Sequence, residues 1–193
     1  MGSSSIGRPQ ARCCLGFYAL VSYIPDPLGA FLNGLKEELA PGNGLHAHLT
    51  LLPPRALQAD PAALVAALGR SLAELPGFEV TLGDVELFEG TNVIYLGLAG
   101  GRETTEAYHR RLSGGLFAFN EPFRFHPHIT LAQNLDPSHV AALLAGARMR
   151  WRRYAGPRSF VVERLVFVRN ETPTHWETLS QHTLAQATLQ RTR

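Results

Sequence analysis

Alternation of apolar and polar residues divides the chain into strands and helices in a regular order. Residues 13–24 are apolar and aromatic, which predicts a strand, and residues 26–40 place leucines at helical spacing before the stop signal PGNG. A strand-like run at 46–52 ends at Pro53 and Pro54, and a helix over 60–75 starts at an Asp-Pro pair. Strands are then expected over 78–88 and 92–100.

The second half of the chain repeats this order. The pattern predicts a helix over 102–119, weakened by Gly114 and Gly115, a strand at 126–133, a helix that begins at Asp136, and strands over 158–170 and 175–184. Strand, helix, strand, helix and strand thus occur twice, with a period of 80 residues from His48 to His128, and one strand is added at the end. We predict a duplicated lobe with a pseudo-twofold axis.

Composition indicates an ordinary globular domain. Hydrophobic residues make up 45% and charged residues 18% of the 193 residues, which is typical of a folded globular domain. We expect a single domain of two lobes over 13–193, preceded by a flexible tail over 1–12. The two cysteines, Cys13 and Cys14, are adjacent and imply no disulfide framework, which suits the cytoplasm. Because no segment reaches the roughly 18 apolar residues of a membrane span, we expect no membrane association.

The two halves differ in charge. Residues 1–100 carry 5 basic and 9 acidic side chains, whereas residues 101–193 carry 13 and 7. The second half is therefore the better candidate for binding a phosphate-rich ligand. The segment 148–158 places five arginines beside Trp151 and Tyr154, which suits either an RNA backbone with stacked bases or a solvated loop, and we favour the loop.

Two histidine motifs occupy equivalent positions in the two repeats, HAHLTL at 46–51 and HPHITL at 126–131. Side chains alternate along a strand, so His48 and Thr50 point to one face while the leucines beside them point to the core. His128 and Thr130 follow the same rule. A twofold relation between the repeats would therefore bring two imidazoles and two hydroxyls together in one cleft.

This set of side chains suits phosphoester chemistry. One neutral imidazole accepts a proton from the attacking water or hydroxyl, and the other, as imidazolium, protonates the leaving oxygen. The ordinary histidine pKa of about 6.5 allows both forms near neutral pH, and neither a metal nor another cofactor is required. We predict His48 and His128 as catalytic residues and Thr50 and Thr130 as phosphate ligands.

The sequences HLTL and HITL, the latter within FHPHITLAQ, resemble the motifs of the 2H phosphoesterase superfamily, whose bacterial branch is called the 2′-5′ RNA ligase or LigT-like family. The resemblance extends from GFYAL at 16–20 to HWETLSQHTL at 175–184. It implies a bilobal α+β fold with antiparallel sheets around a central cleft and helices outside. It also implies cleavage of the 2′,3′-cyclic phosphate ends of RNA or nucleotides, typically to 2′-phosphates, with reversible 2′-5′ ligation in some members.

One position departs from the family pattern. Many relatives have HITLAR at the second motif, whereas this chain has Gln133 in the last place, so one cationic contact to the substrate lacks its usual residue. Phe17 and Trp176 are aromatic strand residues that could stack on a base, although such residues are more often part of the core. His46 and His126 are expected at the rim of the site. The histidines outside the motifs are expected at the surface or in packing positions: His109, His139, His175 and His182.

Two alternatives to this enzyme stay open. Gln133 is consistent with a related cleft that binds nucleotide or RNA ends without turnover. The paired HxH sequences also permit a zinc hydrolase, although neither motif contains a carboxylate or a cysteine. In each case we expect a monomer, and for the enzyme the partner is RNA or a nucleotide with a 2′,3′-cyclic phosphate.

Overall fold

The computed structural model describes residues 16–42, 44–88, 90–172 and 175–186, so the expected tail over 1–12 and both cysteines lie outside the described residues. The elements in chain order are β1 Phe17–Tyr23, α1 Leu28–Leu39, β2 His48–Ala56, α2 Pro61–Leu72, β3 Phe78–Phe88, β4 Val93–Gly100, α3 Arg102–Leu112, β5 Ile129–Ala132, α4 Val140–Arg153, β6 Ser159–Val162, β7 Arg164–Thr172 and β8 His175–Thr183.

The strands form two antiparallel sheets of four strands each, in the orders β2-β1-β7-β8 and β5-β4-β3-β6. The first three strands of the two orders correspond: β2 and β5, the two histidine strands, lie at equivalent edges, β1 is equivalent to β4, and β7 to β3. The third strand of each repeat pairs in the sheet of the other repeat, because β3 lies beside β4 and β7 lies beside β1. The α+β class and the pseudo-twofold duplication predicted from the sequence are confirmed.

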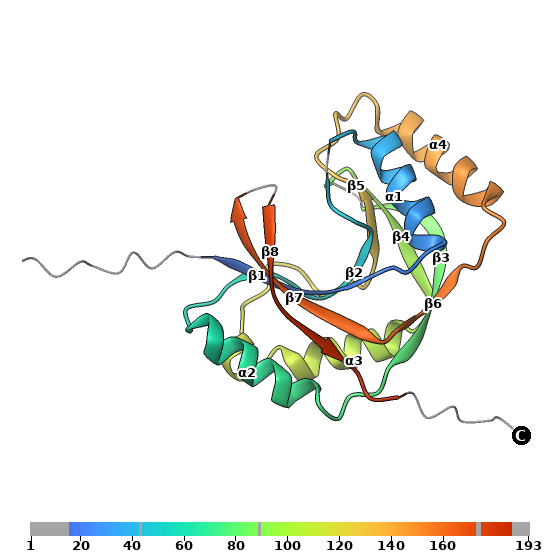
Figure 1. Ribbon diagram of the computed structural model, residues 1–193. Coiled ribbons are helices and arrows are strands. Elements are labelled where there is room, and N and C mark those ends of the chain that lie inside the picture. Colours follow the sequence, from blue (N-terminus) through green and yellow to red (C-terminus); the bar gives the residue numbers. More distant parts are fainter. Residues whose placement is uncertain (1–15, 43, 89, 173–174, 187–193) are drawn as a thin grey trace, which may run out of the picture.

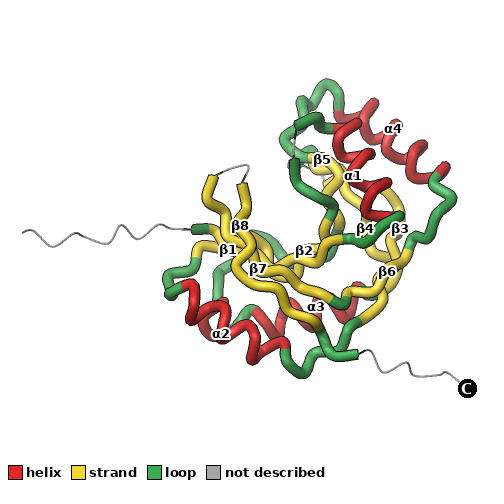
Figure 2. Tube along the Cα trace, viewed as in Figure 1, coloured by secondary structure: helices red, strands yellow, loops and turns green. Residues whose placement is uncertain are grey.

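The helices lie on the outer faces of the sheets, as Figures 1 and 2 show. Helices α2 and α3 cover the sheet of β1 and β2, whereas α1 and α4 lie together against the sheet of β4 and β5. Helix α1 thus belongs to the first repeat in sequence but packs on the histidine strand of the second repeat. No helix among the described residues is long and apolar enough to cross a membrane.

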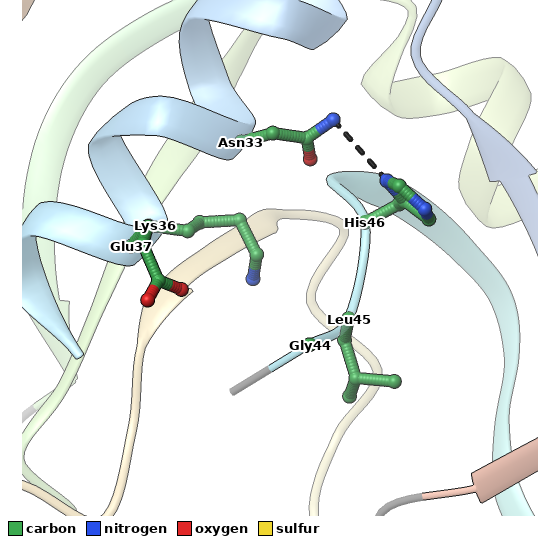
Figure 3. Close-up of a pocket in the computed structure, with 6 residues that line it drawn as sticks. All are labelled: Asn33, Lys36, Glu37, Gly44, Leu45 and His46. Carbon is green, nitrogen blue, oxygen red and sulfur yellow. Dashed lines mark hydrogen bonds between the residues drawn. The ribbon is translucent and has the colours of Figure 1, made fainter. Parts of the chain in front are cut away.

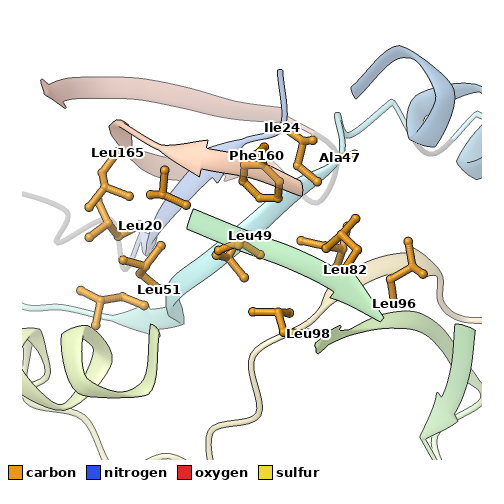
Figure 4. Close-up of a cluster of buried hydrophobic side chains, with 14 of the residues drawn as sticks. Leu20, Ile24, Ala47, Leu49, Leu51, Leu82, Leu96, Leu98, Phe160 and Leu165 are labelled. Atoms are coloured by element: carbon orange, nitrogen blue, oxygen red, sulfur yellow. The ribbon is translucent and has the colours of Figure 1, made fainter. Parts of the chain in front are cut away.

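The main core lies between the sheets and their helices. Leu49 and Leu51 of β2 and Ile129 and Leu131 of β5 are fully buried, as the alternation predicts. Figure 4 shows leucines of β1, β2, β3 and β4 meeting in this core. The histidine and threonine side chains of the motifs therefore stand on the opposite face of each sheet, which we call the open face.

Several boundaries differ from the sequence expectation. β2 continues through Pro53 and Pro54 to Ala56, because it is an edge strand and its register with β1 shifts at the two prolines, so the missing N–H groups interrupt the ladder only locally. The predicted strand 158–170 is broken at Glu163: β6 pairs with β3 in one sheet and β7 with β1 in the other.

Two helices also end at other places than expected. α3 ends at Leu112 rather than near 119, and Gly115 follows with a positive φ of 57°. α4 continues to Arg153, so the arginine-rich segment is mostly helical and the predicted loop is wrong there. Its apolar side packs on β3 and α1, and this tertiary support extends the helix beyond the alanine-rich part.

Candidate functional site

His48 and His128 have the same local environment. In each ring Nδ1 lies 2.7 Å from the carbonyl oxygen two residues earlier, that of His46 or His126. A carbonyl oxygen only accepts hydrogen bonds, so Nδ1 carries the proton and the neutral ring presents its lone pair at Nε2. His48 begins β2, whereas His128 immediately precedes the short strand β5. The sequence predicts a strand over 126–133, so His126–His128 lie outside the strand that the structure shows.

The two rings lie within electrostatic range of each other. Burial lowers the pKa of His48, and the positive charges of Lys36 and His128 lower it further, against the hydrogen bond to the His46 carbonyl, which raises it. Burial likewise lowers the pKa of His128, with a smaller contribution from His126 in the same direction. Both rings therefore favour the neutral state more strongly than a free imidazole does.

The threonines follow the histidines on the open faces. Thr130 Oγ1 lies 3.1 Å from Nε2 of His128, so its hydroxyl donates to the neutral ring and would accept from the imidazolium. Thr50 is half-buried and lies opposite Val21 of β1, two residue pairs from the His48–Tyr23 pair. Each motif thus presents one ring and one hydroxyl on the same strand face.

Aromatic rings from the neighbouring strands flank both histidines. The Tyr23 ring of β1 meets the His48 ring edge-on, with centroids 6.3 Å apart. In the other sheet, Phe88 and Tyr95 stack at 3.9 Å and meet the His128 ring edge-on at 5.0 and 5.4 Å. The Tyr95 hydroxyl donates to Glu86 at 3.0 Å, and burial together with that carboxylate raises the pKa of Tyr95 to about 12.

Sequence reasoning did not identify two polar residues of α1 that contact the motifs. Asn33 accepts the backbone N–H of Ala47 at 2.6 Å, and the Lys36 ammonium donates to the Thr130 carbonyl at 3.0 Å. Both line a pocket of about 160 Å³ beside His46, which Figure 3 shows. The signal was present in the sequence, because Lys36 interrupts the apolar helix face four residues after Leu32.

Phe17 and Trp176 lie away from the histidines. Both pair with Asn170 of β7, in the row Phe17, Asn170, Trp176 across three strands. His48 pairs with Tyr23, six residues further along β1, which places the Phe17 row roughly 20 Å from the His48 row. Phe17 is 50% exposed, whereas Trp176 packs against a small apolar cluster on the open face of its sheet.

The remaining predicted residues take simpler positions. Gln133 follows the last residue of β5 and is exposed. His46 is exposed and lies with Nδ1 3.3 Å from the Asn33 amide, whereas His126 is half-buried beside Phe88 and Tyr95. Both contribute their backbone carbonyls to the site.

The alternative of a base-stacking surface at 148–158 does not hold for Trp151. Its side chain is 1% exposed, donates to the Gly83 carbonyl, and packs under Arg158. The other four histidines do not belong to the site: His109 is buried against Phe125, His182 is half-buried, and His139 and His175 are exposed.

A resident metal would need a suitable group of ligands. Within the part of the chain that the structure describes, no three His, Cys, Asp or Glu side chains converge as a metal site requires. A catalytic zinc site has at least three protein ligands. Each HxH pair offers two histidines, and among the described residues no third ligand joins either pair.

Comparisons with known proteins agree with this architecture. Solved structures of Escherichia coli LigT superpose on the chain at 20% identity, with TM-scores of 0.60 in complex with 3′-AMP and 0.61 in the apo form, covering 89% of this chain and 99% or 98% of LigT. The protein TT0787 of Thermus thermophilus superposes with a TM-score of 0.56 at 19% identity, over 88% of this chain and 98% of that protein.

A comparison with curated protein sequences returns no match. The sequence profile of the 2′-5′ RNA ligase superfamily, however, matches residues 24–174, which include both histidine motifs and most of both sheets. The family expected from the paired motifs is thereby confirmed, and this chain belongs to the 2′-5′ RNA ligase superfamily of 2H phosphoesterases.

Proposed function

We propose that this chain is a metal-independent phosphoesterase that hydrolyses the 2′,3′-cyclic phosphate ends of RNA or nucleotides to 2′-phosphates. The observation that carries the proposal is the matched pair of histidines, His48 and His128. Each is fixed through Nδ1 on a backbone carbonyl, each presents Nε2, and the two interact electrostatically. Membership of the superfamily supports phosphoester chemistry, and the geometry of the pair supports acid and base catalysis.

The proposed reaction needs one proton acceptor and one proton donor. Nε2 of one ring takes a proton from water as the oxygen attacks phosphorus, and Nε2 of the other gives a proton to the departing 3′ oxygen. The product is the 2′-phosphate. Thr50 and Thr130 bind the non-bridging oxygens. In ligation a ribose hydroxyl takes the place of the attacking water, and the same two proton transfers give a 2′-5′ phosphodiester.

The lowered pKa values set a condition on this cycle. Because both rings favour the neutral form, the acid must gain its proton when the substrate binds. A bound phosphodiester anion raises the pKa of an imidazole beside it, so substrate binding favours protonation of the ring that acts as the acid. Support for a nucleotide ligand comes from LigT, whose solved structures include complexes with 3′-AMP, ATP and NADP+.

Incubation with 2′,3′-cyclic AMP in the presence of EDTA tests the proposal, with the 2′ and 3′ monophosphates separated by chromatography. We expect 2′-AMP, and a loss of about 10² to 10⁴ in rate for His48→Ala and for His128→Ala. His139→Ala is the matched control, because His139 is exposed at the start of α4, outside both motifs. Full activity in either motif variant would refute two-histidine catalysis.

The same experiment separates the alternatives. A binding module of this fold retains 2′-AMP, detected by calorimetry, but releases no product from the cyclic substrate. A zinc hydrolase loses its activity in EDTA, and elemental analysis of the purified protein would detect the metal.

A further inference from the structure

Lys36 is the only lysine of the chain, and its position is unusual for that residue type. It lies in α1 and is only 5% exposed. Among the described residues no carboxylate forms an ion pair with its ammonium, whose one partner is the Thr130 carbonyl. A buried charge without a counter-ion is costly, so a fold retains one mainly where it has a function.

The bond to Thr130 joins the two repeats. α1 precedes the first histidine motif in sequence, yet Lys36 reaches across to β5, 94 residues further along the chain. β5 has four residues and lies at the edge of its sheet, so its backbone has a strand partner on one side only. The Lys36 ammonium donates a hydrogen bond to that edge at Thr130, the residue whose hydroxyl contacts Nε2 of His128.

One turn earlier, Asn33 makes the equivalent contact to the first motif. Its amide oxygen accepts from the Ala47 N–H at 2.6 Å, and its amide nitrogen lies 3.3 Å from Nδ1 of His46. Residues three apart share one face of a helix, and Figure 3 shows both side chains leaving the same helix toward the pocket. α1 therefore holds the segment before His48 with Asn33 and the segment after His128 with Lys36.

The charged groups around Lys36 are few. His46 and Glu37 line the same pocket, and the Glu37 carboxylate accepts the backbone N–H of Gly42. The positive charge of Lys36 also lowers the pKa of His48. The Lys36 ammonium thus contacts the second motif at the Thr130 carbonyl and acts through its charge on the ring of the first motif.

We propose that Lys36 is a positioning residue of the two-histidine site: its buried ammonium ties α1 to the Thr130 carbonyl of β5, beside the hydroxyl that contacts His128, and brings a positive charge to the histidine pair. The role of this ammonium in turnover rests on the proposed phosphoesterase function. The contact between Lys36 and Thr130 and the effect of the Lys36 charge on His48 do not depend on that function.

The kinetic test compares Lys36→Met, which keeps the length of the side chain, with Lys36→Arg, which keeps the charge. Misplacement of a reacting group by about 1 Å costs roughly a hundredfold in rate, so we expect Lys36→Met to lose tenfold to a hundredfold in kcat. The acid limb of its kcat/KM profile should move to higher pH, because His48 is easier to protonate without the charge. Lys36→Arg should restore the position of that limb.

Arg152→Met serves as the control, because Arg152 is an exposed cation on α4 and its removal should leave the profile unchanged. A Lys36→Met profile that coincides with that of the wild type would overturn the proposal. An equal loss of kcat in both Lys36 variants, with no shift of the pH profile, would also overturn it, since that pattern indicates a purely structural role.

A second measurement needs neither turnover nor a variant of Lys36. Because the chain has one lysine, labelling with lysine enriched in carbon-13 at Cε gives a single resonance. We expect it to titrate below the ordinary lysine pKa of about 10.4, since burial lowers the pKa of Lys36, and to show a second inflection as His48 titrates. That inflection should vanish in His48→Gln and persist in His139→Gln. A single titration at the ordinary value would overturn the proposal, whatever the outcome of the phosphoesterase assay.

Discussion

The ion pair between Arg55 and Glu121 joins the end of β2 to the segment that precedes the second histidine motif. Arg55 lies near the end of β2, and Glu121 lies in the segment that leads from α3 to His126 and His128. Arg55 is 1% exposed and donates from Nη2 to Glu121 at 2.6 Å, from Nη1 to the Phe117 carbonyl and from Nε to the Pro53 carbonyl. We predict that Glu121→Gln destabilises the fold by leaving the buried guanidinium without its counter-charge.

The magnitude follows from burial. Removing one partner of a buried ion pair costs about 3 to 5 kcal/mol. Two carbonyl bonds to Arg55 remain in the variant, and the Glu121 side chain is 18% exposed, so we expect a cost below that range, about 2 to 3 kcal/mol. For a chain of this size that loss lowers Tm by roughly 5 to 10 °C.

The chain contains a matched control for this experiment. Arg150 and Glu38 also meet at 2.6 Å, but their side chains are 46% and 50% exposed. Glu38→Gln should therefore cost much less stability than Glu121→Gln, because solvent screens an exposed pair. Urea unfolding of both variants measures the difference. Equal costs for the two substitutions would refute the argument that burial, rather than distance, determines the strength of these pairs.

Three further predictions follow from the site and core. Burial lowers the pKa of both His48 and His128, so kcat/KM should follow a bell-shaped pH profile centred below about pH 6.5. The free energy of unfolding should also fall as pH drops below that value, because the rings of the unfolded chain bind protons at higher pH than those of the folded chain. Leu131→Ala, at a fully buried position behind the second motif, should cost about 2 to 5 kcal/mol in urea unfolding, and a cost below about 1 kcal/mol would contradict the packing. Gln133→Arg should lower KM for a cyclic nucleotide severalfold with little change in kcat, and an unchanged KM would show that the position does not contact substrate.

The repeat and the orientation of the motifs could be predicted from the sequence because both depend on local alternation. Strict alternation around Leu49 and Ile129 fixes which face of each strand is buried, and hence where His48 and His128 point. The order of the elements revealed the duplication. These features need no knowledge of which strands pair.

Features that depend on pairing could not be predicted in this way. The continuation of β2 through Pro54 and the break at Glu163 follow from which strands lie at the edges and which sheet each segment joins. The contact between Lys36 and Thr130 spans 94 residues and requires α1 to pack on the sheet of the other repeat. Phe17 and Trp176 share the open face with His48, and only the strand register shows how far along it they lie.

The central claim is that one phosphorus lies between the two motif histidines, and a crystal structure with a bound nucleoside 2′-monophosphate tests it most directly. The account predicts oxygens of a single phosphate within about 2.6 to 3.2 Å of Nε2 of both His48 and His128. A phosphate bound to only one of the two rings, or seated elsewhere while both Nε2 atoms stay free, would contradict it.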